Sequence, residues 1–248
     1  MQEITHGIYL ETDFSGITLG VISRPHGLIL IDAPPRPEDI KTWRAALLNL
    51  SGGVDRILVN LDAHIDRTLG DRGMECTVVA HEKTAQVFRN RPTTFKAQSN
   101  ETGSEWEQIN SMSGTRWAPP EVTFDQQMWI HWGEAPVSLE YHPGPNQGAI
   151  WAVIPDEHVA FVGDLITPGQ PPFLANADLP EWISSLNLLL DGNWRSYTLV
   201  SGRSGLVAQK EVHNQIEYLT KIHADMESLA HKKEPPEATE TLIPELLS

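Results

Sequence analysis

The stretch "VNLDAHIDRTLG" (Val59–Gly70) decides the fold and locates the candidate site. It continues a short apolar run, so it is predicted to be a loop at the carboxyl end of a buried strand. Asp62, His64 and Asp66 occupy alternate positions, and Arg67 comes next. Carboxylate and imidazole groups are common ligands of divalent metal ions, whereas an arginine does not coordinate them. This layout is typical of a metal-binding loop, but in a generic loop such residues are more often solvated side chains than ligands, so the spacing alone leaves both interpretations open.

The composition is that of a globular protein. The chain has 248 residues, 40% of them hydrophobic, and eight tryptophans add large apolar side chains to the core. The single cysteine, Cys76, excludes an intramolecular disulfide and a cysteine-rich zinc site. No apolar run reaches the length of a membrane span, and the start lacks the basic-then-apolar pattern of a signal peptide. We expect a cytoplasmic protein.

The charge balance limits the partners of this chain. With 33 acidic and 18 basic residues, the formal net charge is −15. Such a surface repels phosphate backbones and anionic lipids, so neither nucleic acid nor a membrane is expected as a partner. A small-molecule ligand is compatible with this charge because a basic pocket can exist locally. A homo-oligomer also remains open.

Two groups of strands, each followed by helices, organise the chain. In the first half, three apolar runs precede a helix over Arg36–Leu50, and "DRILVNL" and "CTVVAHE" are predicted strands before a helix at "EKTAQVFRN". The second half holds the strands "TFDQQMWIHW", "PVSLEYHPG", "GAIWAVIPD", "EHVAFVGD" and "YTLVSG". Its helices are "LPEWISSLNLLLDG" and a long amphipathic one from about Ala208 to Lys232. This order predicts an α/β (α+β) protein with two sheets face to face and helices outside.

No linker divides the chain, so one domain over residues 1–231 is expected. The polar segment 89–120 has no clear periodicity and is predicted to be a long, lid-like loop with one helix near Glu105–Ser111. Residues 232–248 form a tail rich in proline and glutamate, which is expected to be flexible when isolated.

Four sequence blocks resemble the metallo-β-lactamase fold superfamily. "GLILIDA" looks like the family's strand that ends in an aspartate, and "ILVNLDAHIDRTLG" aligns with its strand followed by T-H-x-H-x-D-H-x-x-G. "HPGPNQGAIWAVIPDEHVAFVGD" is similar to the P-G-H-T-x-G block with its following G-D pair, and "LVSGRSG" to the closing G-H-G. The resemblance covers about residues 7–229. It implies a four-layer αββα sandwich with a metal site at the strand ends.

The resemblance also assigns the metal positions, and several have changed. The family's ligand positions fall on Asp62, His64, Asp66, Arg67, Pro145, Asp164 and Arg203. Asp62, His64 and Asp164 would still hold a single Zn, Mn or Fe ion at the first metal position. Pro145 has replaced a histidine there, and His142 nearby is a further candidate ligand.

The second metal position keeps Asp66 and shares Asp164, but Arg67 and Arg203 replace its histidines. Two guanidinium groups supply roughly the charge of a divalent ion, and they pair with carboxylates that are costly to bury alone. We therefore expect an Arg–Asp network in place of at least the second metal.

Three functions are compatible with these residues. The first is a pseudoenzyme that binds a small anionic ligand through Asp66, Arg67 and Arg203, without a metal cofactor. The second is a hydrolase with one divalent transition metal on Asp62, His64 and Asp164, acting on a small ester, thioester or lactone, with Asp66 as a candidate general base. The third is a structural or interaction protein. The first is preferred because dinuclear chemistry needs ligands that this chain has lost.

Overall fold

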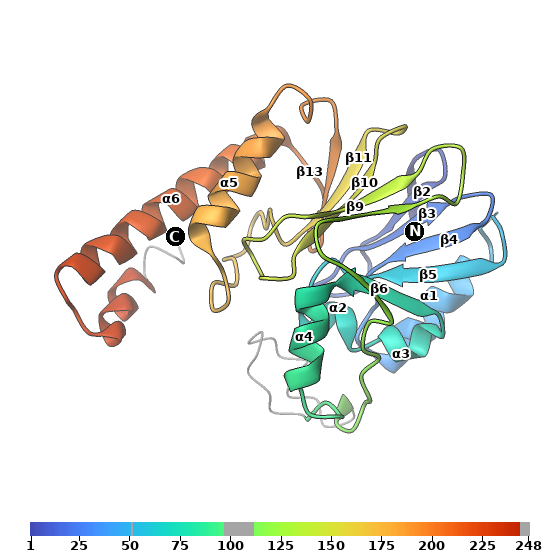
Figure 1. The fold of residues 1–248 in the computed structure, drawn as a ribbon, viewed down its shortest axis with the longest axis horizontal. Helices are drawn as coiled ribbons and strands as arrows, with labels where there is room; N and C mark the ends of the chain where they lie inside the picture. Colours follow the sequence, from blue (N-terminus) through green and yellow to red (C-terminus); the bar gives the residue numbers. More distant parts are fainter. Residues whose placement is uncertain (51, 97–111, 244–248) are drawn as a thin grey trace.

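Two sheets packed face to face form the centre of the molecule, and helices cover their outer faces (Figure 1). The computed structural model describes residues 1–50, 52–96 and 112–243. The first sheet has seven strands in chain order: β1 (Gln2–Thr5), β2 (Ile8–Glu11), β3 (Leu19–Ser23), β4 (Gly27–Ile31), β5 (Asp55–Val59), β6 (Thr77–His81) and β7 (Val122–Phe124). Strands β1 to β4 pair antiparallel, and β4 to β7 pair parallel.

The second sheet has six strands in the order β13-β12-β11-β10-β9-β8. These are β8 (Gln127–Ile130), β9 (Val137–Tyr141), β10 (Ile150–Ile154), β11 (Val159–Gly163), β12 (Thr198–Ser201) and β13 (Gly205–Val207). Among these six described strands, only β11 and β12 pair in parallel. Each sheet thus contains a parallel section, and the carboxyl ends of the strands there lead into the candidate site.

The helices form the two outer layers. They are α1 (Pro37–Leu47), α2 (Ile65–Thr68), α3 (Asp71–Met74), α4 (Glu82–Asn90), α5 (Leu179–Leu190) and α6 (Gln209–His231). Helix α1 buries Trp43 and Leu47 against the first sheet, and α5 and α6 bury apolar side chains such as Trp182 and Leu219 against the second. The predicted four-layer αββα sandwich is confirmed. Among the described helices, none combines the length and apolar character that a bilayer span requires.

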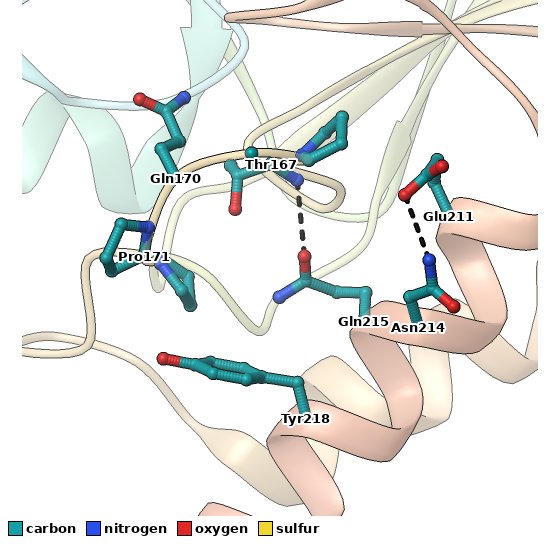
Figure 2. Close-up of a pocket in the computed structure, with 10 residues that line it drawn as sticks. Thr167, Gln170, Pro171, Glu211, Asn214, Gln215 and Tyr218 are labelled. Atoms are coloured by element: carbon teal, nitrogen blue, oxygen red, sulfur yellow. Dashed lines mark hydrogen bonds between the residues drawn. The ribbon is translucent and has the colours of Figure 1, made fainter. Parts of the chain in front are cut away.

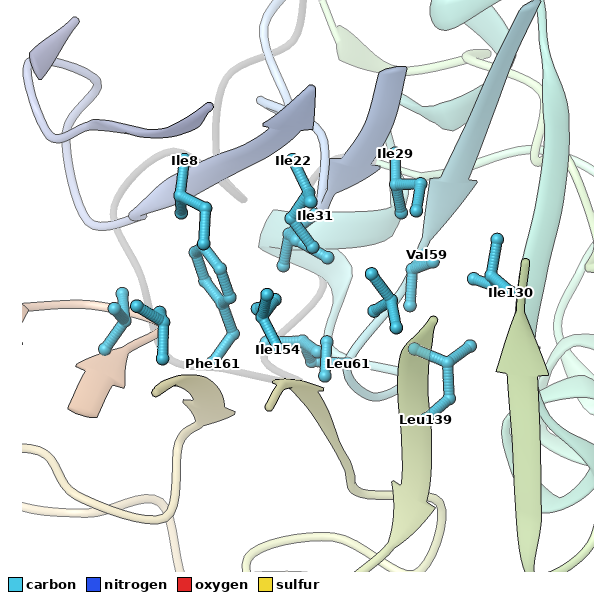
Figure 3. Packing of buried hydrophobic residues seen from close by; sticks show 14 of the residues in the cluster. Ile8, Ile22, Ile29, Ile31, Val59, Leu61, Ile130, Leu139, Ile154 and Phe161 are labelled. Atoms are coloured by element: carbon cyan, nitrogen blue, oxygen red, sulfur yellow. The ribbon is translucent and has the colours of Figure 1, made fainter. Parts of the chain in front are cut away.

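The core between the sheets follows from strand periodicity. In β4, Ile29 and Ile31 point inward, while Leu28 and Leu30 point outward toward α1. Figure 3 shows Ile29 and Ile31 on one side of the inner layer and Phe161 of β11 on the other. Burying an apolar side chain of this size contributes about 1.5–3 kcal/mol. Because β4 is apolar on both faces, it lies in the middle of its sheet and holds the following residue, Asp32, inside the protein.

One segment that was predicted to be a single strand forms two strands in the structure. The segment "TFDQQMWIHW" supplies β7 to the first sheet and β8 to the second, so the chain crosses between the sheets at Asp125 and Gln126. The carbonyl of Asp125 accepts a hydrogen bond from Nε2 of His81, at 2.5 Å. That bond ties the crossing to the end of β6. The break falls where two polar residues interrupt the apolar alternation.

The segment 89–120 is anchored at both described ends. Phe95, Met112 and Trp117 pack with Ile65 and Leu69 beside the "VNLDAHIDRTLG" loop. The expected helix near Glu105–Ser111 lies outside the described residues. In the C-terminal tail, Pro236–Leu242 form a 3-10 helix, η3, that contacts α6, so this part of the expected flexible tail has a defined fold.

Candidate functional site

The predicted site residues meet where the parallel strands end. Asp32 follows β4, and Asp62 follows β5 one strand further along the first sheet. In the second sheet, Asp164 follows β11 and Arg203 follows β12. Because parallel strands place their carboxyl ends at the same edge, residues distant in sequence are brought together.

Arg67 lies at the centre of this arrangement and has no exposed surface. Its Nη2 contacts a carboxylate oxygen of Asp164, and its Nη1 donates to Oδ2 of Asp32 at 3.2 Å. Its Nε lies 3.3 Å from Oδ1 of Asp62. A fully buried guanidinium is stable only with such compensation, because removing an unpaired charge from water costs several kcal/mol.

Arg203 joins two carboxylates. Its Nη1 lies 2.5 Å from Oδ2 of Asp66, while Nε and Nη2 lie 3.0 and 2.9 Å from Oδ2 of Asp164. Both arginines therefore contact acids of the site. We call Asp32, Asp62, Asp66, Arg67, Asp164 and Arg203 the ion-pair network.

Asp32 is a network member to which the sequence assigned no role. Its backbone is left-handed (φ 59°), its N–H donates to the carbonyl of Val59, and its Oδ1 accepts from Leu61 N–H at 3.0 Å. An aspartate tolerates this conformation better than most residues because its side chain bonds locally. The available signal was the aspartate that follows the apolar run in "GLILIDA". Burial raises the pKa of Asp32 to about 7, against the opposing effect of Arg67.

Gly202 makes room for Arg67. A Cβ atom at position 202 would lie 2.7 Å from Nη1 and 2.9 Å from Nη2 of that side chain. Real Cβ atoms do not approach other atoms so closely, and the fully buried guanidinium has no space to withdraw. The first glycine of "SGRSG" is therefore part of the site.

Asp62, His64 and Asp164 are the residues that could hold one metal ion. One ligand atom from each lies within 4.8 Å of the other two, and all three residues are buried. In the structure, Nδ1 of His64 bonds Oδ2 of Asp62 at 2.9 Å and lies 3.4 Å from Oδ2 of Asp164. Nε2 of His64 is buried and has no hydrogen-bond partner among the described residues.

The charges within the cluster stabilise one another. Burial alone would raise the pKa of Asp62, but Arg67 and His64 hold it below its usual range. Asp164 behaves similarly, because Arg203 and Arg67 outweigh its burial and lower its pKa. Burial opposes the charged form of His64, yet Asp62 and Asp164 raise its pKa and favour the imidazolium.

The first and second metal positions that the resemblance assigns differ in whether their residues could hold a metal ion. At the first position the donor set suits a transition metal, although the ion would have to displace the proton that His64 shares with Asp62. At the second position a metal does not fit, because the guanidinium groups of Arg67 and Arg203 contact its two acids, Asp164 and Asp66.

A small cavity of about 120 Å³ opens above the network. Its polar lining includes His64, Asp164, Thr167 and Arg203, and its apolar lining includes Phe173, whose ring packs against that of His64 at 79° with centroids 5.6 Å apart. Pro145, which the resemblance assigns to a ligand position, also lines it.

Several sequence-predicted residues do not line this cavity. Arg67 is fully buried and, like Asp66, is absent from its walls, so of the three predicted ligand-binding residues only Arg203 reaches it. Asp66 is held by Arg203 and is not placed as a general base. His142 stacks on Trp151, with ring centroids 3.6 Å apart, and does not join the candidate metal group of the described residues.

Comparisons with known proteins agree with the observed architecture. A scan against protein-family models and a search of curated proteins found no match. Among solved structures, a metallo-β-lactamase from Pontibacter korlensis superposes with a TM-score of 0.68 at 18% identity, covering 88% of this chain and 97% of the other. A metallo-β-lactamase family protein from Thermus thermophilus has a TM-score of 0.66 at 15% identity, covering 90% and 82%.

A larger protein also contains this fold. The sec-alkylsulfatase Pisa1 from Pseudomonas sp. has a TM-score of 0.66 at 16% identity, covering 93% of this chain and 43% of the sulfatase. At these identities the similarity establishes architecture, and it agrees with the sequence blocks around the ion-pair network. The chain has the fold of the metallo-β-lactamase superfamily.

Proposed function

We propose that this chain is a metallo-β-lactamase-fold pseudoenzyme whose second metal position is replaced by arginine–aspartate ion pairs, and that its small cavity binds a small anionic ligand. The observation that carries the proposal is the contact of both Arg67 and Arg203 with Asp164. That acid falls on the position that, by the resemblance, bridges two metals. With its oxygens paired to guanidinium groups, it is not free to bridge ions.

The two arginines have different roles at the proposed ligand site. Arg67 is fully buried, does not line the cavity, and forms ion pairs with the buried acids. Arg203 lines the cavity, together with the hydroxyl of Thr167 and the ring of His64. Oγ1 of Thr167 and Nε2 of His64 are buried without hydrogen-bond partners in the described structure. These groups suit an acceptor-rich ligand, such as a small carboxylate or phosphate, that the 120 Å³ cavity can hold.

The first experiment measures metal content and anion binding on the same preparation. Protein purified without an affinity tag or chelator is analysed by elemental mass spectrometry and then titrated calorimetrically with phosphate and acetate. We expect only trace transition metal, far below one equivalent, and saturable anion binding that Thr167→Val and Arg203→Lys weaken. A Thr198→Val control, at the exposed first residue of β12, should bind normally. Metal-free protein that binds neither anion would refute the ligand site.

A mononuclear hydrolase is the second candidate, and the proximity of Asp62, His64 and Asp164 favours it. It predicts about one equivalent of Zn, Mn or Fe, lost in His64→Ala, and metal-dependent cleavage of small esters, thioesters or lactones. A cavity-lining change such as Thr167→Val should then alter substrate turnover without removing the metal. Finding the bound metal together with this activity would replace the pseudoenzyme proposal.

A further inference from the structure

A second, larger cavity lies between helix α6 and the loop that follows β11. It has a volume of about 380 Å³ and is lined by loop residues 167–172 and by four residues of α6, Glu211, Asn214, Gln215 and Tyr218. Figure 2 shows Thr167, Pro171, Gln215 and Tyr218 around this space. The volume is within the range of small-molecule binding sites, which is about 300–1,000 Å³. The ion-pair network does not contribute to its lining.

Two polar groups of this cavity are buried without partners. Gln215 is 7% exposed, and its Oε1 accepts a hydrogen bond from the backbone N–H of Thr167 at 3.3 Å. That bond fixes the amide, and Figure 2 shows the amide nitrogen turned toward the cavity. Neither Nε2 of Gln215 nor Oγ1 of Thr167 has a hydrogen-bond partner within the described structure. Leaving such groups unsatisfied is costly, so a ligand that pairs with them gains affinity.

The rest of the lining indicates what kind of ligand these groups would meet. Asn214 donates to Oε2 of Glu211 at 3.1 Å, and both residues line the cavity from α6. The ring of Tyr218 and the prolines of the loop provide apolar faces. The described lining residues include no lysine, arginine or histidine, so an anion would find the carboxylate of Glu211 and no cation.

We propose that this cavity is a binding site for a neutral polyhydroxylated molecule of monosaccharide size. Amide groups and hydroxyls pair with sugar hydroxyls, which both donate and accept hydrogen bonds. An aromatic ring and prolines pack against the apolar C–H face of a sugar. This site is distinguished from the anion site by its α6 residues, although the two cavities share Thr167, Gln170, Pro171 and Pro172.

Saturation-transfer NMR and calorimetry on the full chain test the proposal. The probes are D-glucose, N-acetyl-D-glucosamine and myo-inositol, with D-glucuronate and D-glucosamine as charged comparators. We expect at least one neutral probe to bind saturably and more tightly than either charged comparator. The Gln215→Leu variant removes both the amide donor and its bond to Thr167. The milder Asn214→Ala variant changes only an exposed position. Each variant is expected to weaken binding about fivefold or more, the effect of losing one hydrogen bond.

The Asn187→Ala variant, on the exposed side of α5, is the matched control and should bind like the wild type. The proposal is overturned if no neutral probe saturates below about 10 mM, a concentration beyond which binding is too weak to count as specific. It is also overturned if a charged comparator binds best, or if Asn214→Ala and Gln215→Leu leave the affinity unchanged in folded protein. Anion binding at Arg203 is measured separately, so failure of either site is distinguishable.

Discussion

Arg203 holds one carboxylate oxygen of Asp164 with two nitrogens, Nε at 3.0 Å and Nη2 at 2.9 Å, although the residues lie 39 positions apart. They meet because β11 and β12 are parallel neighbours, so the residues that follow them emerge at one edge of the sheet. The contact places a positive charge beside one of the three residues that could hold a metal ion. The site is therefore organised by the chain's own side chains.

Removing the buried arginine is expected to destabilise the fold strongly. Arg67→Met retains much of the side-chain volume but leaves Asp32, Asp62 and Asp164 without their shared cation. Breaking a buried ion pair in this way costs about 3–5 kcal/mol. Urea denaturation measures the loss. Arg44→Met is the control, because Arg44 pairs with Glu75 at an exposed site and its loss should cost about 1 kcal/mol or less. Equal losses in the two variants would contradict a stabilising role for the network.

A methyl group at position 202 is expected to clash with the guanidinium group of Arg67. Gly202→Ala places Cβ within 3 Å of both terminal nitrogens of Arg67, and the expected loss of stability is about 1–3 kcal/mol. Gly192→Ala is the matched control, since its Cβ would have no atom within 4 Å. Thermal unfolding of the two variants compares them directly. If both variants melt like the wild type, the close approach of Gly202 to the guanidinium of Arg67 is contradicted.

Asp71 provides a pH-dependent test away from the candidate metal ligands. Burial raises the pKa of Asp71 well above its usual value, against a hydrogen bond from Asn60. The folded protein therefore holds a proton that the unfolded chain releases above about pH 4, and this group lowers stability as the pH rises from there toward its folded pKa.

Asp71→Asn removes that titration while keeping an oxygen acceptor for Asn60. It is expected to stabilise the protein at pH 8 and to give a smaller gain at pH 4, because the neutral amide has no proton to lose as the pH rises. Urea denaturation between pH 4 and 8 measures the difference. Asp13→Asn, at an exposed loop position, is the control. A gain that does not change with pH would contradict a raised pKa at Asp71.

His81 should contribute stability with the opposite pH dependence. Its Nδ1 accepts from the N–H of Lys83 at the start of α4, and Nε2 donates to the carbonyl of Asp125. The ring is therefore neutral, and burial lowers its pKa. Because the folded pKa lies below the unfolded one, this stability is present above about pH 6.5 and is lost as the pH falls.

His81→Gln is expected to lower stability at pH 7.5 by about 1 kcal/mol and to reduce the slope of stability between pH 7 and 5. Unfolding in guanidinium chloride at several pH values measures that slope. The exposed His6→Gln variant should retain the wild-type slope. An unchanged slope in His81→Gln would contradict a lowered pKa of His81 in the folded protein.

The sequence alone predicted the layers, because strand and helix periodicity are local properties. Ile29 and Ile31 alternate with Leu28 and Leu30, which marks a strand buried on both faces. The helices over α4, α5 and α6 were predicted close to their observed bounds. Local patterning could not show that "TFDQQMWIHW" crosses between sheets, since both halves alternate as a strand does and only the pairing partners differ.

The sequence also determined that Asp62, Asp66 and Arg67 lie in the loop after β5, and that Arg203 lies in "SGRSG". Only the tertiary structure decided their partners. It added Asp32 to the network, buried Arg67 outside the lining of the small cavity, and turned His142 onto Trp151. Arg67 and Asp164 are separated by 97 residues, and their contact depends on the pairing of two sheets through one shared core. Residue type and spacing indicate which charges a site contains, but the packing of distant strand ends determines which of them neutralise each other and which face a ligand.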